Sequence, residues 1–321
     1  MPGLQHIKRR ITAVKSTKQV TQAMELVAAT KMRRAQETAL SSRPYALTAL
    51  EILANLVEDV TLNDPEGLTA KRFPLLATHP VRQTAVLLVA ADKGLAGSFN
   101  SSIFRKFEQF FSSYSLLTTP HSLSIIAIGQ KATDYARRRG FTVEASFVKF
   151  GDLIHLTEVE PLAQLLSDGF TQAKWDRVVA FSASFVSALR QEVVERQLLP
   201  LSFDRIRQAV EQIIPQTGRY AELRQQIVAS RLERPVEHLI EPSPEEALNH
   251  LLPLLFQMEV YHLILEANAS EHSARRMAMK SATDSAGELI GNLTLAFNRA
   301  RQASITGELT EIAGTVSAME K

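Results

Sequence analysis

Apolar residues at the N-terminal end of the chain follow the alternating spacing of three and four that is typical of helices in coiled coils. Few helix breakers interrupt the pattern, so it predicts one helix reaching about residue 60, with a kink before Pro44. At about 1.5 Å per residue such a helix would be ~85 Å long and would need a partner. The apolar positions are Leu4, Ile7, Ile11 and Val14, and later Ala46, Leu50, Leu53, Val57 and Val60.

A C-terminal helix with the same spacing is the expected partner. Its first apolar series predicts the seam of a left-handed coiled coil. A second series is out of phase with the first, which predicts that the helix leaves its partner after Ala300 and enters a different environment. A stutter within one coiled coil is the alternative. The first series is Met279, Ala282, Ala286, Leu289, Leu293, Ala296 and Ala300, and the second is Ile305, Leu309, Ile312, Val316 and Met319.

The middle of the chain alternates between strand and helix patterns. Short apolar runs predict strands, and amphipathic stretches between them predict helices, which together indicate a βαβ sheet. From about residue 199 to 234 the sequence is polar and contains Pro215 and Gly218, so we interpret it as an insertion. The expected strands are 84–91, 123–128, 142–150 and 177–185, and the expected helices are 98–112, 130–139 and 157–173.

These patterns predict an α/β fold: a long antiparallel coiled coil of the N- and C-terminal helices plus a central Rossmann-like α/β domain. We expect four segments along the chain. They are an N-terminal coiled-coil helix at 1–62, the α/β domain at 80–198, an insertion or linker completing the base at 199–240, and a C-terminal coiled-coil helix at 241–321.

Composition excludes several classes of protein. The chain has no cysteine, which rules out disulfides, thiolate metal sites and a cysteine nucleophile. No signal-peptide core and no membrane-length apolar run is present, so a cytoplasmic protein is expected. The formal net charge is only +2, yet the first 36 residues carry eight basic side chains against Glu25 alone. Such a basic helix suits an acidic partner, although a solvated helix face is the alternative.

One loop is a candidate for phosphate binding. Residues 92–98, DKGLAGS, lie between a predicted strand and a predicted helix, where backbone amides can hold an anion. The spacing of Gly94 and Gly97 fits neither the Walker motif nor the dinucleotide fingerprint. We therefore favour a tight turn in which glycine adopts a positive φ and Ser98 caps the helix.

The remaining polar residues compose no recognisable active site. The eight histidines lack zinc-binding spacing, and Ser182 and Ser184 lie in a predicted strand rather than a nucleophile elbow. We accordingly predict no catalytic residue, no metal site and no cofactor. Aromatic platforms and base-reading modules are also missing, so nucleic acid is not an expected partner.

Both ends of the chain resemble the gamma subunit of F-type ATP synthases. The strongest match is NRARQASITGELTEI at 298–312, and residues 92–100 resemble the first strand-to-helix loop of the family, with Ala96 where many members carry Cys. The segment 199–234 departs from the family pattern, and its lack of cysteine excludes thiol regulation. The other matching segments are 7–11, 17–32, 42–45, 269–271, 274–275, 279–280 and 282–284.

The resemblance implies a non-catalytic rotor shaft. It would couple proton-driven rotation of the membrane c-ring to conformational changes in the catalytic beta subunits, during ATP synthesis or hydrolysis. Its implied partners are the alpha, beta, epsilon and c-ring subunits, with one copy per complex. Membrane association would be indirect, at the cytoplasmic face of a bacterial plasma membrane or at a thylakoid-type membrane. The alternative function is a non-catalytic nucleotide-binding α/β regulatory protein.

The resemblance also implies which residues contact partners. The basic side chains of the N-terminal helix would meet acidic levers on the beta subunits, Met24 would work beside those levers, and the region of Glu241 would face the c-ring. The C-terminal residues would contact the surrounding ring of alpha and beta subunits. The full set is Lys8, Arg9, Arg10, Lys18, Met24, Arg33, Arg34, Glu241, Arg275, Arg301, Gln302 and Thr306.

Overall fold

The computed structural model describes most of the chain and resolves it into two compact units. One unit, here called the coiled-coil unit, comprises Met1–Ala29 and Arg275–Lys321, and the other, the sheet unit, comprises Thr30–Ala274. The described residues are 2–41, 52, 56, 72–78, 80–115, 123–150, 154–187, 189–202 and 240–319. The expected kink at Pro44, the second half of the N-terminal helix, its apolar positions from Ala46 to Val60 and most of the 199–234 insertion lie outside them.

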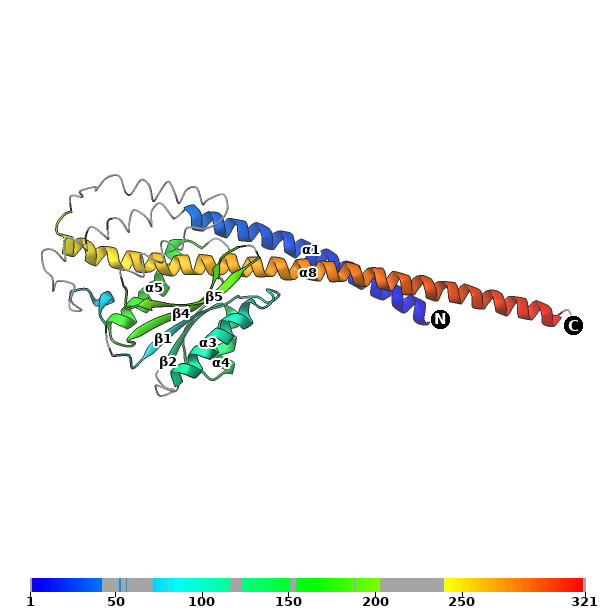
Figure 1. Cartoon of the computed structure of the whole chain (residues 1–321), viewed down its shortest axis with the longest axis horizontal. Coiled ribbons are helices and arrows are strands. Elements are labelled where there is room, and N and C mark those ends of the chain that lie inside the picture. Colours follow the sequence, from blue (N-terminus) through cyan, green and yellow to red (C-terminus); the bar gives the residue numbers. More distant parts are fainter. Residues whose placement is uncertain are drawn as a thin grey trace. The chain divides into compact units, whose positions relative to one another are not determined.

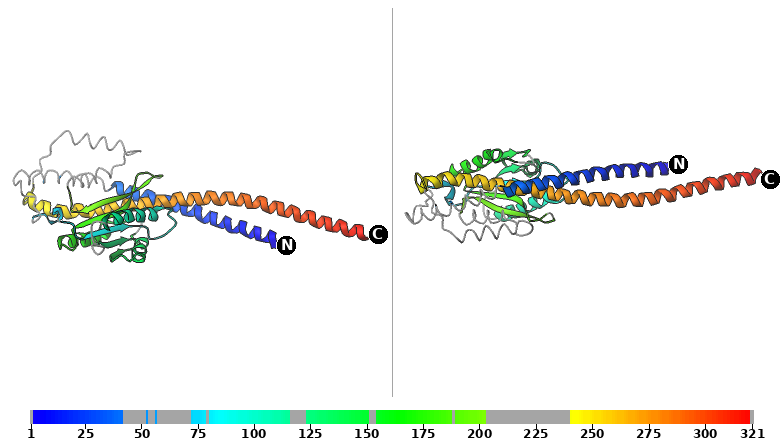
Figure 2. Two further views of the ribbon diagram at one scale, coloured as in Figure 1. Left: turned by 60° about the horizontal axis from the view of Figure 1, so that its bottom comes forward. Right: turned by 90° about the horizontal axis from the view of Figure 1, so that it is seen from above.

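The coiled-coil unit is built from the two terminal helices. Its parts of α1 (Pro2–Ser41) and α8 (Pro244–Met319) run side by side in opposite directions (Figures 1 and 2). The predicted 3-4 spacing in α1 is confirmed, because the same stripe of residues is shielded from solvent along the unit. The shielded positions are Leu4, Ile7, Ile11, Val14, Lys18, Thr21, Glu25 and Ala28.

The seam on α8 differs from the predicted one at two positions. Leu289 is 41% exposed and Ala296 is also exposed, so the prediction for these two residues is wrong. Ile290 and Phe297 are shielded in their place. Two neighbouring stripes of α8 both have 3-4 spacing, and the position of α1 selects the one that is buried. The shielded residues are Met279, Thr283, Ala286, Ile290, Leu293, Phe297, Ala300 and Ser304.

The last part of α8 extends past the N-terminal end of α1 (Figures 1 and 2). Its large apolar side chains at Ile305, Leu309, Ile312 and Met319 are exposed, Leu309 by 62%. We call these four side chains the apolar tip. Within the described chain they pack against no other helix, as expected for a segment whose partner is another molecule.

The sheet unit contains a five-stranded sheet with the order β3-β2-β1-β4-β5. β1, β2, β3 and β4 are parallel, whereas β5 pairs antiparallel with β4. The helices α3, α4 and α5 connect the parallel strands, which confirms the predicted Rossmann-like pattern. The strands are β1 (Thr84–Val89), β2 (Leu123–Ile128), β3 (Val143–Phe147), β4 (Arg177–Phe185) and β5 (Gln191–Leu199). The helices are α3 (Phe99–Ser115), α4 (Gln130–Arg138), α5 (Leu156–Thr171) and a short 3-10 turn, η1 (Pro74–Leu76).

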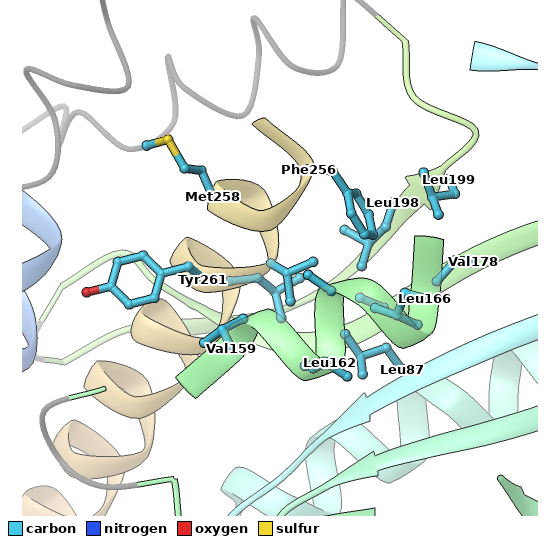
Figure 3. Close-up of a cluster of buried hydrophobic side chains, with 14 of the residues drawn as sticks. Leu87, Val159, Leu162, Leu166, Val178, Leu198, Leu199, Phe256, Met258 and Tyr261 are labelled. Carbon is cyan, nitrogen blue, oxygen red and sulfur yellow. The ribbon is translucent and has the colours of Figure 1, made fainter. Parts of the chain in front are cut away.

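Each face of the sheet carries its own apolar core. On one face, α3 and α4 cover alternate residues of the strands, with Phe107 and Phe181 in edge-to-face contact at 5.6 Å between ring centroids. On the other face, α5 and the first part of α8 meet the sheet, and Figure 3 shows side chains from β1, β4, β5, α5 and α8 converging there. All six residues of β1 are buried because both faces are covered.

Directional hydrogen bonds attach α8 to this unit in addition to apolar packing. The Tyr261 hydroxyl donates to the carbonyl of Ile154 at 3.1 Å, and the Ser270 hydroxyl donates to the carbonyl of Ala183 at 3.2 Å. The Gln191 amide donates to the Ser273 hydroxyl at 3.0 Å. The first part of α8 therefore forms part of the core of the sheet unit.

Candidate interaction surfaces

The loop after β1 is organised around the carboxylate of Asp92. One carboxylate oxygen accepts a hydrogen bond from the backbone N–H of Gln130 at 2.9 Å, and the other accepts from the N–H of Lys149 at 2.9 Å. Asn100 at the start of α3 accepts from the N–H of Ala91 at 2.9 Å. One carboxylate thus ties together the loops that follow β1, β2 and β3 at one edge of the sheet.

This geometry favours the tight-turn interpretation of residues 92–98 over a phosphate site. Gly97 has the expected positive φ of 57°, and Leu95 adopts a positive φ of 63° as well. The loop begins with the carboxylate of Asp92, whose negative charge repels an anion and makes the loop a poor phosphate cradle. The side chain of Ala96 is buried in the core between α3 and the sheet, so this residue has a packing role. Among the described residues, no histidine, cysteine, aspartate or glutamate cluster could hold a metal ion.

The predicted contact residues on α1 are mostly exposed. Lys8, Arg9 and Arg10 lie on the solvent side of the coiled-coil unit, where their charges are available to a partner. Lys18 is different, because it is half-buried and lies in the seam. Met24 is also half-buried. In the sheet unit, Arg33 and Arg34 are exposed, and Arg33 pairs with Glu37 across one helical turn.

The predicted contact residues on α8 fall into two groups. Arg301, Gln302 and Thr306 are exposed and lie close to one another near the start of the apolar tip. Arg275 is half-buried at the other end of the coiled-coil unit. Glu241 belongs to the sheet unit, where it is exposed just before the first turn of α8. The twelve residues therefore form several separate surfaces along the chain.

Exposed apolar side chains on α1 were not predicted. Val20 and Val27, seven positions apart, share one face of α1, whereas Leu26 lies about a third of a turn away from them. All three side chains are exposed, Leu26 by 66%. A pattern of apolar residues indicates burial, but it does not distinguish burial within the chain from burial against a partner. These residues could have been noticed in the sequence, because they are apolar and lie outside the 3-4 stripe that begins at Leu4. Several large exposed apolar side chains within two turns of one helix indicate that a partner protein covers it.

No helix in the described part of the chain has a stretch long and apolar enough to cross a membrane.

A half-buried carboxylate lies where α8 meets β5. Glu266 is 18% exposed, and its carboxylate lies 3.8 Å from the guanidinium of Arg196. Burial raises the pKa of the Glu266 carboxyl above its ordinary value, while Arg196 and a hydrogen bond from Ser184 act in the opposite direction. The Glu266 carboxyl therefore holds its proton more tightly in the folded chain than in the unfolded chain.

The raised pKa predicts a pH dependence of folding stability. The folded state binds a proton more readily, so the contribution of Glu266 is most favourable at low pH and is lost as pH rises through the raised pKa. We expect E266Q to lose less stability than the wild type as the pH rises from the ordinary carboxyl range through the raised pKa of Glu266. Urea unfolding of the full chain at several pH values would measure this difference. E192Q, at an exposed position of β5, is the matched control and should retain the wild-type slope. An E266Q slope equal to that of the wild type would contradict the prediction.

Comparison with known proteins covers the whole chain. A family model described as ATP synthase matches residues 3–319. The ATP synthase gamma chain of Heliobacterium modesticaldum is 36% identical over 319 residues, covering 99% of this chain and 100% of the relative. That of Roseiflexus castenholzii is 35% identical over 320 residues, covering 99% of both chains.

Solved structures share the fold. A chain of the Tetrahymena thermophila mitochondrial ATP synthase central stalk and c-ring has a TM-score of 0.55 at 23% identity, covering 82% of this chain and 99% of that one. A chain of the Euglena gracilis mitochondrial ATP synthase has a TM-score of 0.61 at 17% identity, covering 98% and 94%. The likeness confirms the predicted combination of terminal helices and a central sheet.

Proposed function

Because this chain belongs to the ATP synthase gamma chain family, we propose that it is the central rotor shaft of an F-type ATP synthase. It is a non-catalytic subunit, and the chemistry of ATP takes place in the beta subunits. The observation that carries this proposal is the 36% identity to a gamma chain over the full length of both proteins. The alternative of a nucleotide-binding regulatory protein is not favoured, since Asp92 places a negative charge in the candidate loop.

The two units suit two kinds of partner. The exposed apolar tip, with Arg301, Gln302 and Thr306 beside it, suits the inside of the ring of alpha and beta subunits. The sheet unit would bind the epsilon subunit and, near Glu241, the c-ring. One copy would be present per complex. Attachment to the membrane would be indirect, at the cytoplasmic face of a bacterial membrane or at a thylakoid-type membrane.

The coiled-coil unit is suited to act as a rotor because it is asymmetric. A single antiparallel pair of helices inside a ring of three beta subunits presents a different surface to each of them. Differential contacts then stabilise different conformations of the three subunits, which is allosteric coupling. The basic residues Lys8, Arg9 and Arg10 would face acidic segments of the ring and contribute orientation more than affinity. The exposed side chains of Val20, Leu26 and Val27 would be covered by the same ring.

A double substitution at the start of the apolar tip tests the proposal. In the assembled complex, R301A/Q302A should lower proton pumping per ATP hydrolysed by about fivefold, as expected for a loss of about 1 kcal/mol of coupling. Both residues are exposed, so the fold of the chain itself should be unaffected. The measurement is ATP-driven acidification of vesicles, normalised to the rate of hydrolysis.

The matched control for this experiment is E288A, at an exposed position of α8 outside the predicted contact set. It should pump protons like the wild type. Wild-type pumping by the R301A/Q302A complex would remove these two residues from the contact set. Failure of the chain to copurify with alpha and beta subunits would count against the function itself.

A further inference from the structure

The seam between α1 and α8 changes character along the coiled-coil unit. Toward the N-terminus of α1 the shielded residues are apolar, from Leu4 to Val14. The next seam positions are polar, namely Lys18, Thr21 and Glu25. On α8 this polar section is met by Thr283 and Gly287. A polar layer in the middle of a coiled coil lowers its stability relative to an apolar layer. Such layers are known to specify the alignment of the helices.

The polar layer is joined by a chain of hydrogen bonds. The hydroxyl of Thr283 donates to the hydroxyl of Thr21 at 2.8 Å. Thr21 is buried, and its own hydroxyl donates to the carbonyl of Lys18 in the same helix at 3.0 Å. The carbonyl of Met279 lies 2.9 Å from the Thr283 hydroxyl and offers a second acceptor. Each hydroxyl therefore has a partner in the observed alignment of the two helices.

The side chain of Lys18 adds a steric element to the same layer. A Cβ placed on Gly287 would lie 3.2 Å from the ammonium nitrogen of Lys18. The side chain of Lys18 thus lies across α8 at Gly287, which has no side chain. Lys18 is one of the residues predicted to contact a partner, and its position shows that it also contacts the second helix of its own chain.

The rest of the seam defines the alignment of the helices only weakly. Its apolar members recur at the same 3-4 spacing along both helices, and Ala28, Ala286 and Ala300 are small, so a slip by one heptad again brings apolar residues opposite apolar residues. Sliding by one heptad displaces the helices by about 10 Å. Thr21 would then face Ile290 or Arg276, and the bond from Thr283 would be lost. A buried polar pair penalises such misalignment more strongly than apolar contacts that recur every heptad.

We propose that Thr21 and Thr283, with Lys18 lying across Gly287, fix the axial register of α1 against α8. The register determines how far the apolar tip extends beyond the N-terminus of α1. Under the proposed function it would thereby set the position of the tip inside the ring, and this mechanical consequence rests on that function. The register itself is a property of the chain and can be measured separately.

Disulfide trapping in the assembled complex tests the proposal, because the chain has no cysteine of its own. The observed register places Val14 opposite Ile290, so V14C/I290C should report the correct alignment. V14C/F297C and I11C/A286C should report slips by one heptad in either direction. Disulfides form only when Cα atoms approach within about 7 Å, so a slipped pair reacts only if the helices slide. The readout is the ratio of slipped to correct disulfide after mild oxidation.

Variants at the threonine pair give the expected results. T21V/T283V keeps the shape of both side chains and removes both hydroxyls, so it should raise the ratio of slipped to correct disulfide about fivefold, as expected for loss of one hydrogen bond. T21S/T283S keeps the hydroxyls and should restore the ratio to the wild-type value. T283V alone removes the donor, leaves Thr21 bonded within its own helix, and should also raise the ratio.

The outcomes separate this proposal from the proposed function. A ratio that stays at the wild-type value in both valine variants, including a complete absence of slipped disulfide, would overturn the register proposal. Because the readout needs no ATP hydrolysis, that result would leave the rotor function standing. Failure of R301A/Q302A to affect pumping would in turn leave the register result intact.

Discussion

The variant G129A should lose about 3 kcal/mol or more of stability in the sheet unit. Gly129 connects β2 to α4 with a φ of 87°, which side chains other than glycine rarely adopt. In addition, a Cβ at this position would lie 2.0 Å from the carbonyl oxygen of Ala90. That oxygen belongs to backbone next to the loop tied down by Asp92, so it cannot easily move away. Urea unfolding followed by the fluorescence of Trp175, the sole tryptophan, would measure the loss.

Two other glycines separate the contributions of strain and collision. Gly140 also has a positive φ, of 76°, but a Cβ added there would meet no atom within 4 Å, so G140A should cost about 1 kcal/mol from backbone strain alone. Gly94 has neither feature, and G94A should be close to neutral. If G129A loses no more unfolding free energy than G140A, the collision with the carbonyl oxygen of Ala90 contributes nothing and this explanation is wrong.

The variant G169A should be destabilised by about 2 to 3 kcal/mol through a collision between side chains. A Cβ on Gly169 would lie 2.0 Å from Cζ2 of Trp175. The indole cannot swing aside, because it is only 1% exposed and its N–H donates to the carbonyl of Leu166 at 3.2 Å. Gly169 thus makes room within α5 for the largest buried side chain of the unit. Thermal unfolding should be monitored by circular dichroism. Tryptophan fluorescence is unsuitable here, because the substitution itself changes the environment of the indole of Trp175.

A double substitution checks that Trp175 is the cause. Phenylalanine lacks the ring atoms nearest to Gly169, so G169A should cost far less in a W175F background than in the wild type. The W175F single variant is the control for the loss of the indole hydrogen bond. An equal cost of G169A in both backgrounds would show that the strain arises elsewhere in α5.

Periodicity predicted the elements whose burial is regular along the sequence. β1 is apolar from residue 85 to residue 89 because both faces of the sheet are covered, and α1 keeps its stripe over many turns. β5 was not predicted, because Glu192, Glu195 and Arg196 interrupt any simple alternation of apolar residues. Its place in the sheet comes from antiparallel pairing with β4, a tertiary contact that a local pattern does not reveal.

The candidate contact residues were predicted from the sequence, but their exposure and their contacts within the chain were not. The contact residues came from resemblance, and the structure adds which of them are exposed, half-buried or, like Lys18, engaged within the chain. The choice between Leu289 and Ile290 for the seam depended on the angle at which α1 meets α8, which neither helix determines alone. The contacts of Asp92 join residues 38 and 57 positions apart in the chain, and those of Thr283 join residues 262 apart. Separations of this size leave no local signal in the sequence.

The apolar tip has a consequence for the life of the subunit before assembly. A newly made chain exposes Ile305, Leu309, Ile312 and Met319 until another molecule covers them. Exposed apolar side chains of this kind are what chaperones bind and what promotes aggregation of orphan subunits, and chains left unassembled are open to proteolysis. We therefore expect the cellular amount of this protein to follow the supply of its partners. The segment that would serve motion in the finished complex would also act as a quality-control signal during biogenesis.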